Sequence, residues 1–159
     1  MATAFPAYVA QGAEHTIVRD FTPGADSNEP FIVGDFVFYD TTDNVMQRCG
    51  ANPTLIAGLS EVSSAAATLL TPSAKVPVRL IVGAGVVIAF ASATTPAVSH
   101  IGDSYGITRN AAGQWLLDTA KTTTSSRARI IDVDITNGIF FGVLHENLLQ
   151  FADVEVATS

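Results

Sequence analysis

The residue types of a hydrolytic triad occur close together in the chain, at His100, Asp103 and Ser104. A triad needs its nucleophile, base and orienting acid to meet side chain to side chain, and its members normally come from distant segments. Three residues within five positions of an extended loop cannot readily meet in this way. The other two histidines, His15 and His145, stand in no catalytic motif. The pattern therefore predicts that the chain is not an enzyme.

Two short motifs match only the first residues of a metal-binding motif. His145 and Glu146 start like the helix of a zinc protease, but the second histidine position holds Leu149. The segment 132–138 faintly resembles a calcium loop, but its twelfth position is Val143, where such a loop needs a glutamate. We predict no metal and no cofactor, and we interpret 132–138 as a strand end that runs into a turn.

Cys49 is the only cysteine, so the chain can form neither an internal disulfide nor a site built of several thiolates. The neighbouring Arg48 could lower the pKa of this thiol and make it reactive. The alternative is a half-buried structural thiol. The sequence favours the structural thiol without excluding the reactive one.

Charge in this chain is sparse and acidic. Eight Lys and Arg against fifteen Asp and Glu give a net charge of −7, which disfavours phosphates or an anionic membrane as the partner. We therefore expect no direct binding of nucleic acid and no membrane association. The N-terminus lacks the pattern of a secretory signal, and the longest apolar run, 80–91, is short and contains glycines. These features predict a soluble protein made in a cytoplasm.

Short apolar runs separated by turn residues predict an all-β fold. The clearest stretch holds three strand-like runs, 105–109, 114–118 and 127–133. The first two flank 110–113, whose Asn and Gly tolerate positive φ and suit a tight hairpin. A chain of 159 residues is long enough for one domain with a core. We predict a single-domain β-barrel or sandwich of about eight to ten short antiparallel strands.

Two further stretches have strong strand patterns. Residues 31–39 alternate and predict one strand. Residues 76–82 and 86–91, joined by the glycine-rich 83–85, predict a β-hairpin rather than a dinucleotide-binding turn. Pro77 has no N–H to give to a ladder, which predicts either an edge strand or an N–H position that faces outward.

The remaining segments and the core complete the predicted fold. The Ala-, Ser- and Thr-rich segment 63–73 fits a short helix or a loop equally, 146–151 predicts a helical turn, and 153–156 predicts a last short strand. The residues predicted to form the core are Phe36, Phe38, Val78, Leu80, Ile88, Phe90, Trp115, Ile131 and Phe140.

Residues 1–14 differ from the rest of the chain. They are small and apolar without helical or strand periodicity, which predicts an extended N-terminal arm before a β-rich domain of residues 15–159. A lone domain has little reason to leave large apolar side chains on a flexible terminus. The alternative is that the arm adds an edge strand to the chain's own sheet. The predicted contacts with the capsid or another partner are Phe5, Pro6, Tyr8 and Val9.

Two stretches resemble sequence patterns of small virion proteins from tailed bacteriophages. The first is PFIVGDFVFYDTTDNVMQRCGANPTLIAGLSEVS (30–63), and the second is IGDSYGITRNAAGQWLLDTAKTTTSSRARIIDVD (101–134). On these stretches the chain resembles the capsid decoration, or cement, proteins. The residues that carry the resemblance are Gly34, Asp35, Gly58, Gly102, Tyr105, Gly106, Gly113, Trp115 and Asp118.

The resemblance implies a non-enzymatic structural protein on the exterior of an icosahedral virion capsid. Such a protein is made in the host cytoplasm, binds the major capsid protein, bridges neighbouring capsid subunits and commonly forms a homotrimer. The resemblance carries over no functional residue. The alternatives are a head-completion or tail protein of a phage, and a β-barrel that binds a small ligand or a carbohydrate.

Overall fold

The computed structural model describes residues 5–24, 32–61 and 75–152, and in them the chain is all-β, as predicted. The helical elements are single 3₁₀ turns: η1 (Ala13–His15), η3 (Val98–His100), η4 (Thr123–Ser125) and η5 (Glu146–Leu148). The strands are β1 (Tyr8–Gln11), β2 (Thr16–Phe21), β3 (Phe36–Asp40), β4 (Val45–Arg48), β5 (Gly58–Ser60), β6 (Val76–Ile81), β7 (Val87–Ser92), β8 (Ser104–Arg109), β9 (Trp115–Asp118), β10 (Ala128–Asp134) and β11 (Ile139–Leu144).

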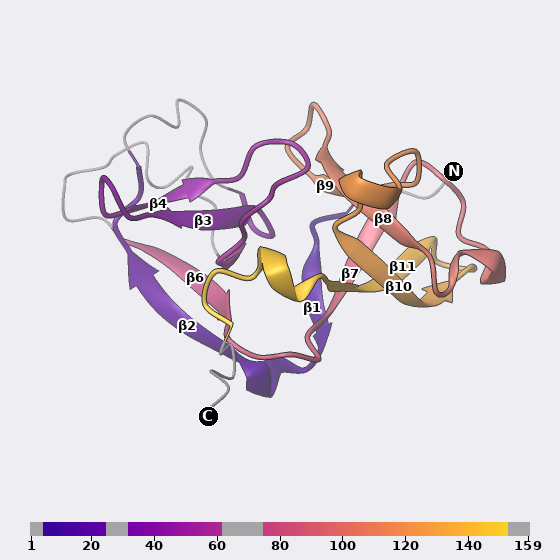
Figure 1. The fold of residues 1–159 in the computed structure, drawn as a ribbon, viewed down its shortest axis with the longest axis horizontal. Coiled ribbons are helices and arrows are strands. Elements are labelled where there is room, and N and C mark those ends of the chain that lie inside the picture. The colour runs from indigo at the N-terminus through magenta and orange to yellow at the C-terminus, as the bar shows by residue number, and fades with distance from the viewer. Residues whose placement is uncertain (1–4, 25–31, 62–74, 153–159) are drawn as a thin grey trace.

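Five of the strands form a small barrel in the order β7-β11-β10-β8-β9. Neighbours in this series are antiparallel, and a parallel pairing of β7 with β9, which sets Ala91 opposite Leu116, completes the ring. β1 pairs with the first part of β7, on the edge that β9 occupies further along. Figure 1 shows these strands gathered in one half of the molecule.

The other half of the molecule is a second sheet with the order β2-β6-β5-β3-β4, in which all neighbours are antiparallel. The two sheets share one core. Phe36 of the second sheet stacks on Phe90 of the barrel with the ring centroids 6.0 Å apart, and it meets Trp115 edge-on at 5.3 Å. These buried aromatic contacts hold the barrel against the second sheet.

The hairpin predicted around 110–113 is confirmed. β8 and β9 are antiparallel, and the Asn110 N–H donates to the carbonyl oxygen of Gln114 at 2.8 Å. Gly113 has a φ of +87°, the left-handed conformation that the Asn and Gly of this turn predicted. The helical turn predicted at 146–151 is also present as η5. The segments 63–73 and 153–156 lie outside the described residues.

The hairpin predicted from 76–82 and 86–91 is wrong. The first run forms β6 in the second sheet, and the second run forms β7 in the barrel. Both edges of β6 are already paired, one with β2 and the other with β5, so β7 has no edge of β6 to join. Pro77 therefore lies in a central strand, so of the two alternatives for Pro77 the edge strand is wrong. Period-two alternation identifies a strand but not its neighbour.

The strand predicted at 31–39 begins later than expected, because Gly34 has a φ of +84° and turns the chain. Within this turn the Asp35 N–H donates to the Ile32 carbonyl oxygen at 3.1 Å, and β3 starts only at Phe36. A Cβ at Gly34 would lie 2.5 Å from the carbonyl oxygen of Ala7. Glycine is thus needed here both for its conformation and for the close approach of two backbones.

The prediction of Ile131 as a core residue is wrong, because this side chain is 44% exposed. The ladder of β10 with β11 shifts register between Ile130 and Asp132, so Ile131 is the extra residue of a β-bulge. The bulge lets Ile130 enter the core and Val133 pack against it, although the two are an odd number of positions apart. Of the other predicted core residues Phe38 is half-buried, and the buried ones are Phe36, Val78, Leu80, Ile88, Phe90, Trp115 and Phe140.

Candidate functional site

The four predicted partner contacts lie in and just before β1, but their side chains point in different directions. Tyr8 is 47% exposed, Pro6 is exposed, and Phe5 is half-buried with its ring centroid 5.9 Å from that of Tyr8. Val9 instead packs against the main core, as its pairing with the core residue Ile88 requires. Three of the four side chains are therefore accessible to a partner, whereas Val9 faces the protein's own interior.

The segment that carries these residues is anchored to the barrel. Residues 8–11 form β1 and pair with β7, which corresponds to the edge-strand alternative for this part of the N-terminal segment. Ala7, directly before the strand, is buried against the turn at Gly34. The exposed side chains of Pro6 and Tyr8 are thus presented by a segment held in place by backbone pairing.

The outer surface of β1, β7 and β11 is apolar. Alternate side chains of β7 and β11 enter the core, so the residues between them point outward, and none of these outward residues is charged. Across the three strands Tyr8 lies opposite Ala89, and Ala89 lies opposite Phe141. An antiparallel sheet that faces water normally carries polar residues on that face. Ala89 is itself buried between Tyr8 and Phe141. We define the outer barrel face as the exposed Tyr8 and the half-buried Ile139, Phe141 and Val143.

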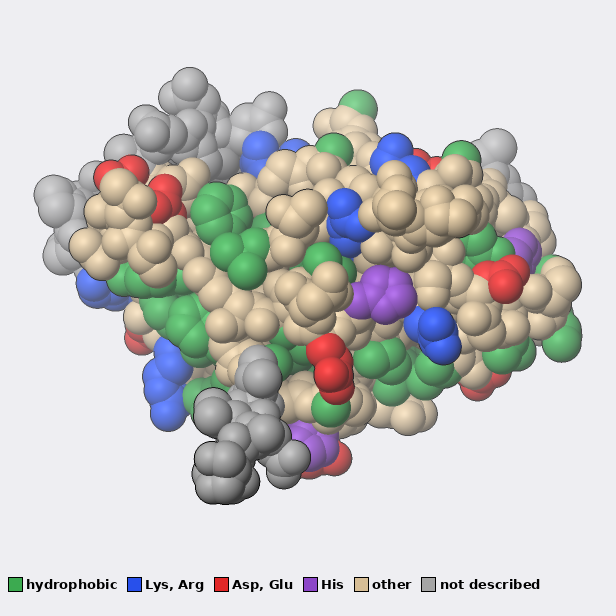
Figure 2. All heavy atoms as spheres, in the orientation of Figure 1, with side chains coloured by type: hydrophobic (Ala, Val, Ile, Leu, Met, Phe, Trp, Pro, Cys, Tyr) green, Lys and Arg blue, Asp and Glu red, His purple; other side chains and the backbone are tan. Residues whose placement is uncertain are grey.

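The next strand, β10, carries charged residues: Arg129 and Asp132 are exposed, and Asp134 is half-buried. Figure 2 shows one side of the molecule, on which hydrophobic side chains lie exposed between scattered charged ones. The apolar strip of β1, β7 and β11 is therefore bordered by charges of both signs along β10.

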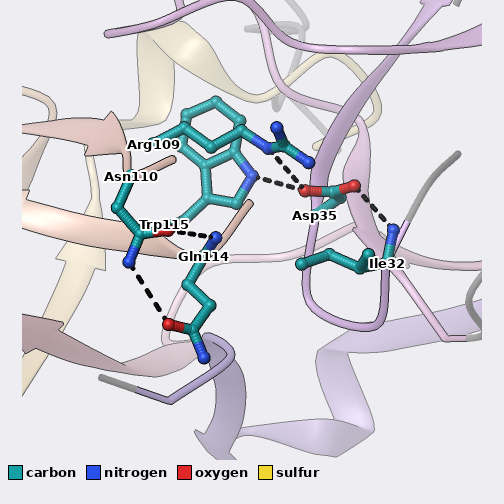
Figure 3. Close-up of polar contacts among 6 residues, drawn as sticks. All are labelled: Ile32, Asp35, Arg109, Asn110, Gln114 and Trp115. Carbon is teal, nitrogen blue, oxygen red and sulfur yellow. Dashed lines mark hydrogen bonds and ion pairs between the residues drawn. The ribbon is translucent and has the colours of Figure 1, made fainter. Parts of the chain in front are cut away.

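A buried carboxylate joins the barrel to the second sheet (Figure 3). Asp35 is fully buried, and its Oδ1 accepts hydrogen bonds from the Trp115 Nε1–H at 2.8 Å and the Arg109 Nε–H at 3.2 Å. Its Oδ2 accepts from the backbone N–H of Ile32 at 2.8 Å. Trp115 and Arg109 belong to the β8–β9 hairpin, whereas Asp35 precedes β3. The contact therefore fixes the orientation of the two sheets, because charged hydrogen bonds out of water are strong and directional.

The turn of the hairpin is shaped to admit Arg109. The Asn110 Oδ1 accepts from the Gln114 N–H at 2.8 Å and closes the turn. A Cβ at Gly113 would lie 2.7 Å from the Arg109 Nη2. Sequence reasoning missed this polar centre because regular alternation with the predicted core residues Phe36 and Phe38 turns Asp35 to the opposite face of the strand. A charged residue inside an apolar run was the available signal.

The residues with the chemistry of a triad are not brought together as one. The His100 ring packs edge-on against Phe140 and Tyr105, with centroid separations of 5.3 and 5.9 Å. Asp103 accepts a hydrogen bond from the Tyr105 hydroxyl at 3.1 Å, and Ser104 pairs with β10 in the sheet. His100 and Asp103 thus contribute side-chain packing and a hydrogen bond at this end of the barrel, and Ser104 contributes backbone pairing.

Cys49 is 4% exposed, so the thiol is buried more deeply than the sequence predicted. Its Sγ donates to the Leu55 carbonyl oxygen at 3.4 Å. Burial raises the pKa of this thiol far above its usual value, and the negative charge of Asp35 adds to the effect. The environment suits a structural thiol and leaves little thiolate for chemistry.

The segment compared with a calcium loop is a hairpin turn between β10 and β11. Asp134 accepts from the Asn137 N–H at 3.0 Å and from the Asn137 Nδ2 at 2.7 Å, and these bonds lower the pKa of its carboxyl group. Gly138 has a φ of +70°. Within the described ranges no group of three or more His, Cys, Asp or Glu side chains is arranged to hold a metal ion.

A surface groove of about 400 Å³ lies beside the second sheet, lined by Phe38 and residues 49–55. Its wall is fixed to the barrel by Asn52, which accepts from the Ile107 N–H at 3.1 Å and donates to the Ser125 carbonyl oxygen at 2.9 Å. Under the alternative function, binding of a small ligand or a carbohydrate, this groove would have room for the ligand.

Comparison of the chain with protein-family models, with curated proteins and with solved structures gives no match. The part of the chain that the structure describes contains no helix long and apolar enough to cross a membrane.

Proposed function

We propose that this chain is a capsid decoration protein: a non-enzymatic virion component that binds the exterior of an icosahedral shell and bridges major capsid proteins. It self-associates as a homo-oligomer, for which the family resemblance suggests a trimer. Its contact with the capsid uses the accessible residues at the N-terminal side of the outer barrel face: the half-buried Phe5 and the exposed Pro6 and Tyr8.

The observation that carries the proposal is the apolar outer barrel face. Two of its strands present uncharged side chains on both of their surfaces, and Tyr8 continues this face onto β1. Tyr8 is exposed, Ile139, Phe141 and Val143 are half-buried, and the β7 residues between them are buried. Accessible apolar side chains grouped in this way favour a contact with another protein. The low proportion of charged residues, 14%, and the net charge of −7 favour a protein surface over a nucleic acid as the partner.

A shell offers the same contact many times over. A decoration protein that binds two capsid subunits at once gains an effective concentration for the second contact, so modest individual contacts become a firm attachment. Such a protein needs a rigid domain and an exposed apolar contact, and it needs no reactive group. The filled barrel core and the buried ion pair at Asp35 supply the rigidity.

Replacing an exposed contact residue tests the proposal without disturbing the fold. Tyr8→Ser removes a half-exposed aromatic ring from the outer barrel face, whereas Ile17→Ser removes a side chain of similar exposure, 38%, from β2 of the second sheet. We expect Tyr8→Ser to weaken co-sedimentation with undecorated capsids by at least tenfold and Ile17→Ser to leave it unchanged.

The melting temperature of each variant separates lost binding from lost folding. Both substitutions are on the surface, so each should melt within a few degrees of the unaltered protein. Equal capsid binding by all three proteins would refute the proposed contact. Absence of binding by the unaltered protein would refute the function itself.

A further inference from the structure

A second apolar surface lies at the end of the barrel, around the start of β8 and the middle of β10. Four of its side chains are exposed aliphatics: Val98 by 68%, Ile101 by 42%, Ile131 by 44% and Ile135 by 53%. The two segments that carry them are joined by backbone hydrogen bonds, because the Gly102 N–H donates to the Ile130 carbonyl oxygen at 2.8 Å. We call these four residues the barrel-end patch.

The bulge in β10 sets which residues lie beside Ile131 on the outside. A regular strand would turn Ile131 and Ile130 to opposite faces and then return Asp132 to the core side. The extra residue instead leaves both Ile131 and Asp132 on the outside, while Ile130 and Val133 serve the core. Bulges commonly re-aim a side chain at a functional position. Here the bulge keeps Asp132 on the outside beside Ile131 and turns Val133 to the core.

Charges of opposite sign flank Ile131 along the same strand. Arg129 lies two residues before it and Asp132 directly after it, and both are exposed. The Asp132 Oδ1 accepts only from the N–H of its neighbour Val133, at 2.8 Å. Neither side chain forms an ion pair with another residue in the described part of the chain. The strand therefore presents a positive end, an apolar centre and a negative end to its surroundings.

We propose that the barrel-end patch binds the same patch of a second copy of this chain around a two-fold axis beside Ile131, midway between Arg129 and Asp132. A two-fold contact brings a patch against the same patch of the second copy, which runs in the reverse direction. Residues on one side of the axis in one copy therefore meet the residues from the other side of the axis in the second copy. At roughly 3.3 Å per strand residue, Arg129 and Asp132 each lie about 5 Å from this axis along β10. Reversal of the second copy places this guanidinium against the Asp132 carboxylate of that copy, and the second Arg129 against the first Asp132.

Self-complementarity is what selects a second copy over another partner. The aliphatic side chains meet at the axis, and both ion pairs form at the rim. A three-fold ring would need two different complementary patches on each chain, so this contact joins copies in pairs, including copies that belong to separate trimers. The inference rests on the self-association part of the proposed function, and capsid binding is measured separately from it.

Charge exchange tests the contact directly. Arg129→Asp sets aspartates against aspartates in a homotypic pair, and Asp132→Arg sets arginines against arginines. In an equimolar mixture of the two variants every facing pair becomes opposite in sign, and the same holds for the double variant R129D/D132R. Self-association is measured by sedimentation velocity over a concentration series, with melting temperatures as the check on folding. Val18→Asp, at a 39% exposed position of β2, is the matched control.

We expect the unaltered protein and the Val18→Asp control to gain mass with concentration. Each single variant should associate at least tenfold more weakly, and the mixture and the double variant should recover association. Equal association by all the variants would overturn the proposal, as would weakening by the single variants without recovery in the mixture, or absence of association in the unaltered protein. Charge-dependent pairing in a protein that fails to bind capsids would support this contact and refute the capsid function.

Discussion

Asp35→Ala should destabilise the fold more than the loss of any surface charge. The substitution removes the partner of Arg109, whose side chain is only 17% exposed, and leaves the donors of Trp115 and Ile32 without their acceptor. Breaking a buried ion pair from one side costs about 3–5 kcal/mol, because a charge stays behind without compensation. Arg109 retains some access to water, so we expect a loss of about 3–4 kcal/mol.

Urea unfolding followed by Trp115 fluorescence measures this loss. Asp118→Ala is the control, because Asp118 pairs with Lys121 at 3.3 Å on the surface and such pairs contribute about 0–1 kcal/mol. Asp35→Asn keeps the shape of the side chain but replaces one acceptor oxygen with an NH₂ donor. We therefore expect the Asp35→Asn variant to be more stable than Asp35→Ala but less stable than the unaltered protein. A loss of less than about 1 kcal/mol for Asp35→Ala would refute the role of this carboxylate in joining the sheets.

Three further predictions follow from single sites. Gly58→Ala should cost roughly 3 kcal/mol by thermal melting, because its Cβ would overlap the Arg79 backbone carbonyl, and a melting point equal to that of the unaltered protein would contradict this. Native Cys49 should react with an aromatic disulfide reagent at pH 8 far more slowly than the unfolded chain, and equal rates would show the thiol to be accessible. Burial, and then the positive charges of Arg129 and Arg127, lower the pKa of His145 from its usual 6.5. The folded protein therefore favours the neutral imidazole. This contribution to the free energy of unfolding is complete above pH 6.5 and is lost as the pH falls through the pKa of His145 in the folded state. His145→Gln should flatten the fall in unfolding free energy between pH 7 and 5, and Arg129→Ala should raise the His145 pKa measured by NMR; an unchanged pH profile or pKa would oppose this reasoning.

Local patterns predicted local structure well in this chain. The hairpin at 110–113 needed only turn residues between two alternating runs, and these interactions are close in sequence. The supposed hairpin at 76–91 failed because the partners of β6 are β2 and β5, which no pattern within that stretch specifies. Ile131 failed for a related reason, since a bulge of one residue reverses the faces that alternation assigns.

The candidate site was only partly accessible to sequence reasoning. Large apolar residues near the N-terminus marked a surface of interest, but strand pairing decided that Val9 turns inward and Tyr8 outward. The outer barrel face could not be anticipated, because it depends on which strands lie beside β1. The buried contact of Asp35 with Trp115 joins residues 80 positions apart, and only the packing of the two sheets brings them together.

A reconstruction of the intact virion by electron microscopy would locate this protein on the particle. We expect density for this barrel at every equivalent position over the outer capsid surface, with Tyr8 against a major capsid protein and the groove at 49–55 free of it. Density confined to one vertex, as in a neck or tail, or no density for the chain on the head, would contradict the proposed function.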